Sequence, residues 1–525
     1  MKSGQTIMSY KVRVENPVIP GFNPDPNIIR VGDDYYVLVS TFEWMPGIRV
    51  YHSNDLVNWE HITDILTEQV QLKGNPENCS IWAPQISYCE DKFYVVYTNV
   101  RSTRVPFKDC HNYVITAPSI FGPWSEPIYL NSSGFDPSIF HDTNGKKWLL
   151  NVLWDYRMKT RNKSCGIVLQ ELCPETMQLI GEVYKIFDGT SLAKTEAPLI
   201  YKKEDYYYLL TAEGGTEKNH SVTVCRAKSI EGPYEVDPDG EVLTARDKTD
   251  SFLQCTGHGS LVEGVDNKWY MMYLCTRPIE KKYEILGREA AIQEVTWTED
   301  GWLRMANLTT NSERYTNVIT SKETKQMLTT DFTDDFSGQL KSEWNGRRRL
   351  PNKSWCNITK EKKLHIKSGE SLQSAFDQSL LAIRQKDFIF KVTTKFEFCP
   401  KTFNQMTGLT IYLDEKNYLY AYLTKDEELG NVLRIMRSDN GNFELEKIKI
   451  PYSQDEVELK LECNYLDGQF FFFSKQEWKK LGEKQNLRNL SGGFTGAYIG
   501  ISVQDLDAFS GNFAEFSYFS YEKME

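Results

Sequence analysis

The chain has 525 residues, of which 40% are hydrophobic, 25% are charged and 13% are aromatic, and its formal net charge at pH 7 is -11. This length predicts more than one domain, and the negative charge argues against nucleic acid or an anionic membrane as the main partner. No apolar run approaches the roughly 20 residues of a membrane-spanning helix, so we expect no membrane partner.

The amino-terminal segment and the cysteines bear on the cellular compartment. The segment MKSGQTIMSYKVRVENP lacks the apolar core of a secretory signal. The 11 cysteines are odd in number and scattered, and none forms a CxxC pair. These features predict a cytoplasmic protein with reduced thiols and no zinc site.

An aromatic strand pattern recurs five times in the first 280 residues, as DDYYVLVS, DKFYVVYT, GKKWLLNV, DYYYLLTA and NKWYMMYL. The repeats are roughly 54 to 62 residues apart, which predicts one small antiparallel sheet per repeat. Long apolar stripes with a 3.6-residue period are absent, so we expect few helices. Five such sheets predict an all-β domain of the five-bladed β-propeller class. The aromatic anchors of the five repeats are Tyr36, Tyr94, Trp148, Tyr208 and Tyr270.

One position in each repeat lies at a strand entrance, about 11 or 12 residues before the anchor. If the repeats are blades, the side chains there converge on the axis of the ring: Asp25, Trp82, Asp136, Glu196 and His258. Proline follows both aspartates and is expected to hold each one extended, with its carboxylate aimed. Three carboxylates around one pocket suit hydrolysis of a sugar acetal, which needs an acid at the leaving oxygen and a base or nucleophile on the opposite face.

Flat rings, a guanidinium and an imidazole complete the predicted pocket. Trp82 and Phe42 offer faces suited to a sugar ring, with ordinary core packing as the alternative. Arg288 is suited to donate paired hydrogen bonds to substrate hydroxyls, and a structural ion pair is its alternative. His258 is expected by the pocket floor, or else as a satisfied structural histidine.

The amino-acid composition of the chain changes after about residue 305, where NLTTNSERYTNVITSKETKQ is polar, rich in threonine and without an aromatic anchor. We therefore expect a propeller over residues 1–327 and a second domain over 328–525. In the second part VELKLEC alternates, TGLTIYL and NYLYAYL are rich in strand formers, and Asp467-Gly468 and Asn440-Gly441 are typical of hairpin turns. This pattern predicts an antiparallel β-sandwich that caps the pocket of the first domain.

Six ordered motifs resemble glycoside hydrolase family 43, and specifically its β-xylosidase branch. They are NPVIPGFNPDPNIIRVGDDYYVLVSTFEW, IWAPQISY, GFDPSIFHD, TEAPLIYKKEDYYYLLTAEGGT, TGHGSLV and LGREAAIQEV. The similarity continues at SLQSAFDQSLLAIRQ and FNQMTGLTIYLDEKNYLYAYL, so it covers nearly the whole chain. The resemblance implies a five-bladed propeller with a carboxy-terminal β-sandwich, and an inverting mechanism that releases xylose from the non-reducing end of xylooligosaccharides.

The resemblance also assigns roles, motif by motif. Asp25 would be the general base, Glu196 the general acid, and Asp136 the residue that tunes the pKa of the acid and orients it. Arg288 would bind substrate hydroxyls, with Phe42 and Trp82 lining the subsites.

Two further expectations come from the resemblance. His258 resembles the axial histidine of the family, which often stands beside a calcium ion or water in the central channel, and no other cofactor is implied. The sandwich of the family sends a loop toward the pocket mouth, and the stretch 504–511, with Phe509 as the residue that reaches the pocket, is the candidate here.

The chain departs from the branch at four positions. Ala197 and Leu199 stand in a motif that usually reads Glu-Gly-Pro-His, which removes a polar group expected near the acid. Met45 stands where an aromatic is common, and Gln85 where an acidic residue is frequent in the wider family. We expect these changes to affect substrate preference while leaving the three carboxylates intact.

The sequence thus predicts an exo-acting, inverting β-1,4-xylosidase with α-L-arabinofuranosidase side activity, because both pentoses present similar hydroxyls to a shallow pocket. Its partners would be xylooligosaccharides or arabinose-containing oligosaccharides. The alternatives are a predominantly α-L-arabinofuranosidase enzyme and a non-catalytic sugar-binding propeller. The resemblance also implies a homodimer or homotetramer.

Overall fold

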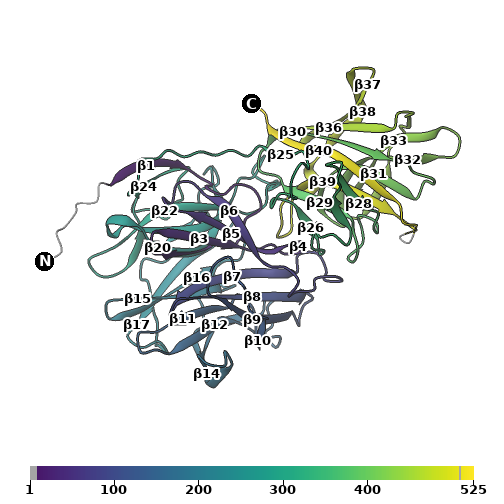
Figure 1. Ribbon diagram of the computed structural model, residues 1–525. Coiled ribbons are helices and arrows are strands. Elements are labelled where there is room, and N and C mark those ends of the chain that lie inside the picture. Colours follow the sequence, from purple (N-terminus) through teal and green to yellow (C-terminus); the bar gives the residue numbers. More distant parts are fainter. Residues whose placement is uncertain (1–8, 508–509) are drawn as a thin grey trace.

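The protein is built almost entirely of β-strands. The computed structural model describes residues 9–507 and 510–525. Within these ranges the helices are two short 3-10 turns, η1 (Val265–Asn267) and η2 (Arg488–Leu490), and neither is long and apolar enough to cross a membrane. Two β domains follow one another along the chain (Figure 1). The predicted all-β class is confirmed.

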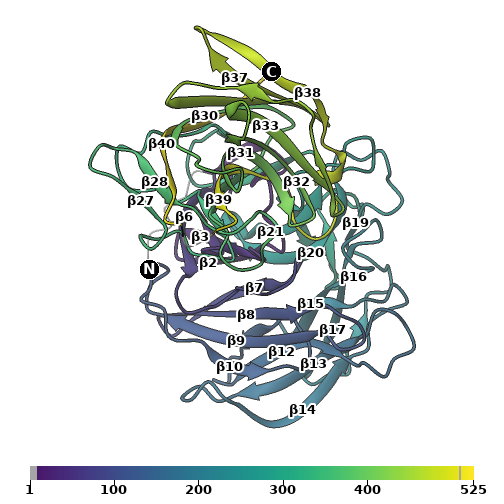
Figure 2. The same cartoon turned by 90° about the vertical axis from the view of Figure 1, so that its right-hand side faces the viewer.

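The amino-terminal domain is a five-bladed propeller, as predicted. Each blade is an antiparallel sheet of consecutive strands, and the first strands of the five sheets pack around a common axis (Figure 2). The first blade comprises β2 (Asn27–Val31), β3 (Asp34–Val39), β5 (Gly47–Ser53) and β6 (Glu60–Leu66). The second comprises β7 (Ser80–Cys89), β8 (Lys92–Ser102), β9 (Asp109–Ala117) and β10 (Ile128–Asn131). The third comprises β11 (Ser138–His141), β12 (Lys147–Trp154), β13 (Ser164–Leu172) and β14 (Leu179–Phe187).

The last two blades continue the ring. The fourth comprises β15 (Glu196–Lys203), β16 (Tyr206–Glu213), β17 (Ser221–Ala227) and β18 (Glu235–Val236), with the short β19 (Leu243–Thr244) also paired to β17. The fifth comprises β20 (Gln254–Glu263), β21 (Trp269–Thr276), β22 (Glu289–Trp297) and β23 (Leu303–Met305). The amino-terminal β1 (Tyr10–Glu15) pairs with β24 (Tyr315–Thr320), and Ile19 exchanges backbone hydrogen bonds of 3.1 and 3.2 Å with Ala290 of the fifth blade. The start and the end of the propeller are therefore bonded together.

A hydrogen bond joins the innermost strands at each of the five blade junctions. A side-chain oxygen meets a backbone group of the neighbouring blade in every case, which satisfies buried polar groups that the strand ladders cannot reach. From the first junction to the closing one, these bonds are Ile86 N to Asn27 Oδ1 at 3.0 Å, Ile139 N to Gln85 Oε1 at 2.9 Å, Ser138 Oγ to Pro198 O at 2.5 Å, Leu261 N to Tyr201 Oη at 2.8 Å and Ile28 N to Ser260 Oγ at 3.0 Å.

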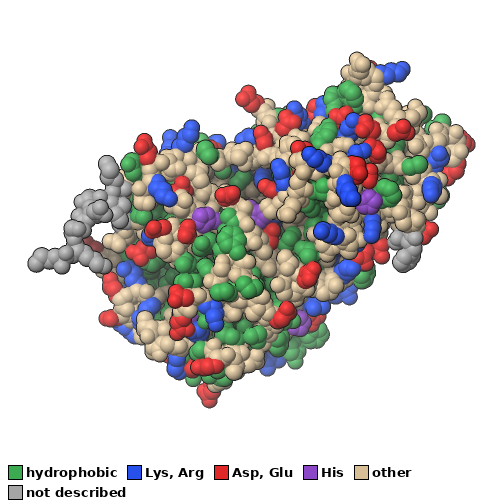
Figure 3. All heavy atoms as spheres, viewed as in Figure 1, with side chains coloured by type: hydrophobic (Ala, Val, Ile, Leu, Met, Phe, Trp, Pro, Cys, Tyr) green, Lys and Arg blue, Asp and Glu red, His purple; other side chains and the backbone are tan. Residues whose placement is uncertain are grey.

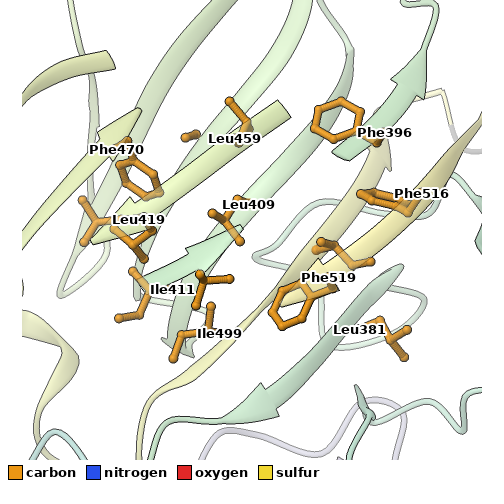
Figure 4. Packing of buried hydrophobic residues seen from close by; sticks show 14 of the residues in the cluster. Leu381, Phe396, Leu409, Ile411, Leu419, Leu459, Phe470, Ile499, Phe516 and Phe519 are labelled. Atoms are coloured by element: carbon orange, nitrogen blue, oxygen red, sulfur yellow. The ribbon is translucent and has the colours of Figure 1, made fainter. Parts of the chain in front are cut away.

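The carboxy-terminal domain is a sandwich of two antiparallel sheets. Side chains from both sheets meet in one apolar core that includes Leu409, Ile411, Leu459, Phe470 and Phe516 (Figure 4). One sheet contains β25 (Phe332–Asp334), β27 (Cys356–Ile358), β28 (Leu364–Lys367), β30 (Ile389–Phe398), β36 (Glu456–Asn464), β37 (Asp467–Ser474), β38 (Glu477–Asn486) and β40 (Phe513–Lys523). The other contains β26 (Asn345–Arg347), β29 (Leu380–Arg384), β31 (Gln405–Asp414), β32 (Asn417–Asp426), β33 (Gly430–Asp439), β34 (Asn442–Leu445), β35 (Ile450–Pro451) and β39 (Tyr498–Asp505).

The two domains share a sheet. The short β4 (Trp44–Met45) leaves the first blade and pairs with β26 at the edge of the sandwich. The Trp44 ring stacks on Tyr498 with centroids 3.8 Å apart, and the buried Arg347 donates to Glu43 at 3.2 Å. The interdomain stretch between β24 and β25 spans residues 321–331, and the predicted boundary at 327/328 lies inside it.

Acidic and basic side chains are interspersed over both domains on the face shown in Figure 3. A face of mixed sign does not favour a polyanion, which agrees with the net charge of -11.

The junction bonds yield a stability prediction. Replacing Asn27 by alanine removes the acceptor of the buried Ile86 N–H and leaves that donor unpaired. Such an orphan costs about 1–3 kcal/mol, so we expect a lower free energy of unfolding by that amount, measured by urea denaturation. The exposed Asn442 in β34 offers a matched control, and Asn442→Ala should stay close to wild type. Equal stability of the two variants would show that the junction bond contributes nothing.

Candidate active site

A small pocket lies at the axis of the propeller, where the innermost strands begin. Its cavity volume is about 190 Å³, below the roughly 300–1,000 Å³ of pockets for drug-sized ligands. It is therefore suited to a single sugar ring. Its lining residues are Asp25, Phe42, Trp82, Lys108, Phe135, Asp136, Asn162, Lys194, Glu196, Gly215, Thr216, Glu217, His258, Arg288 and Phe494.

All five residues predicted at the strand entrances line this pocket, but their register differs by one position in two blades. A left-handed backbone marks the same place in every blade, at Asp25 (φ 55°), Ala83 (39°), Asp136 (52°), Ala197 (53°) and His258 (52°). Trp82 and Glu196 thus precede the equivalent position. The side chains of Trp82 and Glu196 still reach the pocket. The strand pairing of β7 and of β15 is irregular directly after these residues.

The expectation that proline holds the two aspartates extended was wrong. The angles of Asp25 and Asp136 lie in the left-handed region, which aspartate tolerates better than most residues but which is still strained. Since all five blades adopt it, the strain belongs to the way in which each chain segment turns into its innermost strand. The turn presents the side chain to the axis.

Asp25 is held as an anion by its neighbours. Arg288 Nη1 donates to its Oδ1 at 2.7 Å, Ser40 Oγ donates to its Oδ2 at 2.6 Å, and His258 Nδ1 lies 3.5 Å from Oδ1. Burial raises the pKa of this carboxyl, but Arg288, His258 and Ser40 together outweigh burial and bring the pKa below its ordinary value. Asp25 is therefore ionised at neutral pH.

The surroundings of Asp136 and Glu196 have the opposite effect to those of Asp25, because they raise the pKa values of both carboxyls. Burial is the main reason that the pKa of Asp136 lies well above its ordinary value, and the charges of Glu196 and Asp25 raise it further. Burial also raises the pKa of Glu196 to about 7, against the opposing effect of Lys108. The backbone N–H of Ala197 donates to Asp136 Oδ2 at 3.1 Å, which ties Asp136 to the residue next to Glu196. At neutral pH this pair therefore retains a proton that isolated carboxyls would have lost.

Lys108 is the cation beside this pair, and the sequence reasoning missed it. Its ammonium lies 4.1 Å from the ring centre of Phe135, 4.4 Å from Trp154 and 5.0 Å from Trp82. Burial lowers its pKa, and the neighbouring Glu196 limits that shift. No local sequence pattern identifies Lys108, because it lies in the loop between β8 and β9, outside the repeated strand motifs.

An aromatic wall closes one side of the pocket. The rings of Phe42 and Trp82 are 5.7 Å apart, and both contact Phe494 of the sandwich, at 6.2 and 5.6 Å. Phe494 N donates to Asn78 Oδ1 at 2.7 Å, and its carbonyl accepts from Arg288 Nη2 at 3.1 Å. The sandwich therefore contributes a pocket residue whose backbone is anchored to the propeller.

The structure places Phe494 of the sandwich in the pocket, a residue that the sequence analysis did not name. Phe494 lies in SGGFTG, a glycine-rich loop whose composition was the available signal. Phe509, the sequence candidate, lies outside the described residues. Arg288 combines both of its predicted alternatives, since it lines the pocket and pairs with Asp25.

The departures at Leu199, Met45 and Gln85 do not touch this pocket among the residues that the structure describes. Leu199 packs in the apolar cluster between the fourth and fifth blades, so the expected loss of a polar group beside the acid was wrong. Met45 lies in the strand that joins the sandwich, and Gln85 forms a blade-junction bond. Ala197 contributes its backbone N–H, which needs no particular side chain.

The surroundings of His258 do not provide ligands for a hard cation. Calcium prefers six to eight oxygen ligands, whereas His258 faces Asp25, whose carboxylate is already paired with Arg288. In the described parts of the chain, no group of three or more His, Cys, Asp or Glu is placed to hold a metal ion. The expected calcium is therefore unconfirmed.

The chain matches two family models in succession. Residues 14–303 match Glycosyl hydrolases family 43, and residues 333–522 match the Beta xylosidase C-terminal Concanavalin A-like domain. The chain belongs to glycosyl hydrolase family 43.

Relatives of known name match over nearly the full length. The chain is 40% identical to "Beta-xylosidase" of Bacillus subtilis, over 98% of this chain and 100% of that protein. It is 39% identical to "Xylosidase/arabinosidase 43B" of Humicola insolens, over 98% of each. The crystal structure of a xylan beta-1,4-xylosidase from Bacillus halodurans superposes with a TM-score of 0.94 at 42% identity, and the match covers 97% of this chain and 100% of that one.

The aromatic wall formed by Phe42, Trp82 and Phe494 leads to a prediction about substrate binding. Phe494→Ala removes one ring from the pocket while the domain junction at Trp44 and Arg347 stays intact. Because one aromatic contact contributes about 0.5–1.5 kcal/mol, we expect kcat/KM for xylobiose to fall roughly 3- to 10-fold, mainly through KM. The exposed Phe443 on the sandwich supplies a control, since it is 56% exposed and Phe443→Ala should not change KM. An unchanged KM in Phe494→Ala would contradict a substrate contact.

Proposed function

We propose that this protein is an exo-acting, inverting β-1,4-xylosidase that releases xylose from the non-reducing end of xylooligosaccharides. The observation that carries the proposal is the division of charge in one sugar-sized pocket. Asp25 has a lowered pKa, and Glu196 has a pKa raised to about 7. Two carboxyl groups with opposite protonation states are what an acid and a base require. The small volume and the wall formed by Phe494 favour one terminal sugar over an open chain.

The proposed reaction is a single displacement. Asp25 accepts a proton from water as the water oxygen bonds to the anomeric carbon. Glu196 gives its proton to the glycosidic oxygen as the bond between that oxygen and the anomeric carbon breaks, so the anomeric configuration is inverted. Asp136 accepts a hydrogen bond from the backbone N–H of Ala197, which helps to position the neighbouring Glu196, and the two buried carboxyls together retain the proton that Glu196 gives up. The guanidinium of Arg288 keeps Asp25 ionised and extends into the pocket toward substrate hydroxyls.

The pentose specificity rests on the relatives as well as on the pocket. All three names given above specify xylosidase, and one of them includes arabinosidase. We therefore infer a weaker α-L-arabinofuranosidase activity in the same pocket. Turnover of aryl β-xyloside and aryl α-arabinofuranoside tests this, with the xyloside expected to give the higher kcat/KM. A large preference for the arabinoside would make the enzyme primarily an arabinofuranosidase, and proton NMR of the first product tests inversion.

The two pKa shifts predict the pH profile. Activity needs Asp25 ionised and Glu196 protonated, so kcat/KM should fall above pH about 7, where Glu196 loses its proton. It should fall on the acid side only at pH values low enough to protonate Asp25, below the ordinary carboxyl range. Glu196→Gln should remove the alkaline limb and reduce kcat for xylobiose by about 10²- to 10⁴-fold.

A control for this substitution is available on the rim of the same pocket. Glu217 lines the pocket and is exposed, so Glu217→Gln changes charge without removing the proposed acid. The alkaline limb should persist in that variant. Full activity of Glu196→Gln on xylobiose would remove Glu196 from the role of acid.

Three further properties belong to the same proposal. The 11 cysteines are all free, which supports a reducing compartment such as the cytoplasm, and fractionation of the native host tests this. A homodimer or homotetramer is proposed from the family resemblance and is tested by light scattering. A calcium ion beside His258 is proposed from the family resemblance and is tested by metal analysis of the purified protein.

A further inference from the structure

Two exposed aromatic side chains contact each other beside the active site. Phe107 is 63% exposed and Tyr156 is 56% exposed, and their ring centroids lie 5.4 Å apart with an interplanar angle of 46°. Among the ring contacts of the described residues, this is the pair in which both partners are more than half exposed. Because more than half of each side chain is exposed to water, the two rings offer an apolar surface to a ligand and do not belong to the hydrophobic core.

The loops that carry these rings also form the pocket rim. Phe107 directly precedes Lys108, and Tyr156 belongs to the loop between β12 and β13 that contributes Asn162 to the lining. Trp154, the last residue of β12, donates through Nε1 to Pro106 O at 2.8 Å, which bonds the strand end that precedes Tyr156 to the loop of Phe107. The aromatic pair is therefore fixed relative to the pocket.

The leaving group of the proposed reaction cannot extend through the aromatic side of the pocket. The sandwich blocks the side of Phe42 and Trp82, where Phe494 completes the wall. The remaining rim is formed by Lys108, Asn162, Lys194, Thr216 and Glu217. Lys108 is also the cation with the largest influence on Glu196, which protonates the leaving oxygen. A chain that leaves on the Lys108 side of the rim comes to the loops of Phe107 and Tyr156.

We propose that Phe107 and Tyr156 form a stacking platform for the leaving-group part of a xylooligosaccharide, beyond the sugar next to the scissile bond. This inference rests on the proposed function and names the part of the substrate that lies outside the pocket. Pyranose rings carry C–H groups on their faces, and such faces pack on aromatic rings as apolar groups do. Xylose residues lack a hydroxymethyl arm, so two neighbouring rings can be contacted without steric hindrance.

The test compares substrates of increasing length. The double variant Phe107→Ala/Tyr156→Ala is assayed for kcat/KM on aryl xyloside, xylobiose and xylotetraose. We expect the first two to stay within about twofold of wild type and xylotetraose to fall roughly 3- to 10-fold, the range that one or two aromatic contacts represent. The control variant Phe121→Ala/Tyr129→Ala removes two exposed aromatic residues of the second blade that are 68% and 48% exposed, and it should leave all three substrates unchanged.

Other outcomes overturn the platform. Equal losses on all three substrates would show a general disturbance of the pocket, and unchanged xylotetraose kinetics would show that the rings do not contact substrate. If the double variant elutes as a smaller assembly than wild type in size-exclusion chromatography, and the dependence of kcat/KM on substrate length is unchanged, the pair forms a contact between copies of the chain.

The failure of the proposed function is distinguishable from the failure of the platform. If wild-type protein hydrolyses none of the substrates, the proposed xylosidase activity is wrong. Calorimetric affinities of wild type and the double variant for xylobiose and xylotetraose then test the platform directly. A selective loss of xylotetraose affinity supports it, and equal affinities overturn it.

Discussion

The relative positions of the catalytic groups depend on hydrogen bonds between blades. Asp25 and Asp136 each lie two residues before a side chain that bonds across a blade junction, namely Asn27 and Ser138. Glu196 lies two residues before Pro198, the acceptor of the Ser138 bond. Because only two residues separate each carboxyl from a junction, a blade that shifts carries its carboxyl with it. Closure of the ring is thus also the constraint that sets the relative positions of Asp25, Asp136 and Glu196.

The second domain extends this constraint to the pocket wall. Gly287 and Gly496 bring the two backbones so close that a Cβ on Gly287 would lie 2.7 Å from the Cα of Gly496. Arg288 follows directly, and its side chain reaches both Asp25 and the carbonyl of Phe494. The same contact therefore holds Asp25 ionised and places the aromatic residue of the sandwich. This explains why a domain without a carboxyl cluster of its own is part of the active site.

The sequence predicted the parts of the fold and of the pocket that recur in every blade. It did not predict the pocket residues that belong to no repeat. Five aromatic strands predicted the propeller, and the paired Asp-Pro motifs located Asp25 and Asp136. Counting from the anchors could not distinguish Glu196 from Ala197, because the irregular pairing of β15 shifts the register by one residue. The proline after Ala197 marked the equivalent position more directly. Phe494 and Lys108 could not be placed from the sequence, since their neighbours in space are far away in the chain and follow no period.

The charges of the pocket explain how three carboxyls coexist in so small a volume. Three buried anions would be costly, because each loses hydration and repels the others. Arg288 neutralises Asp25 through a bond of 2.7 Å, while Asp136 and Glu196 avoid the cost by retaining protons. Lys108 prevents the pKa of Glu196 from rising further, which keeps its proton transferable near neutral pH. The same desolvation that threatens stability thus produces the unequal proton affinities on which acid and base catalysis depends.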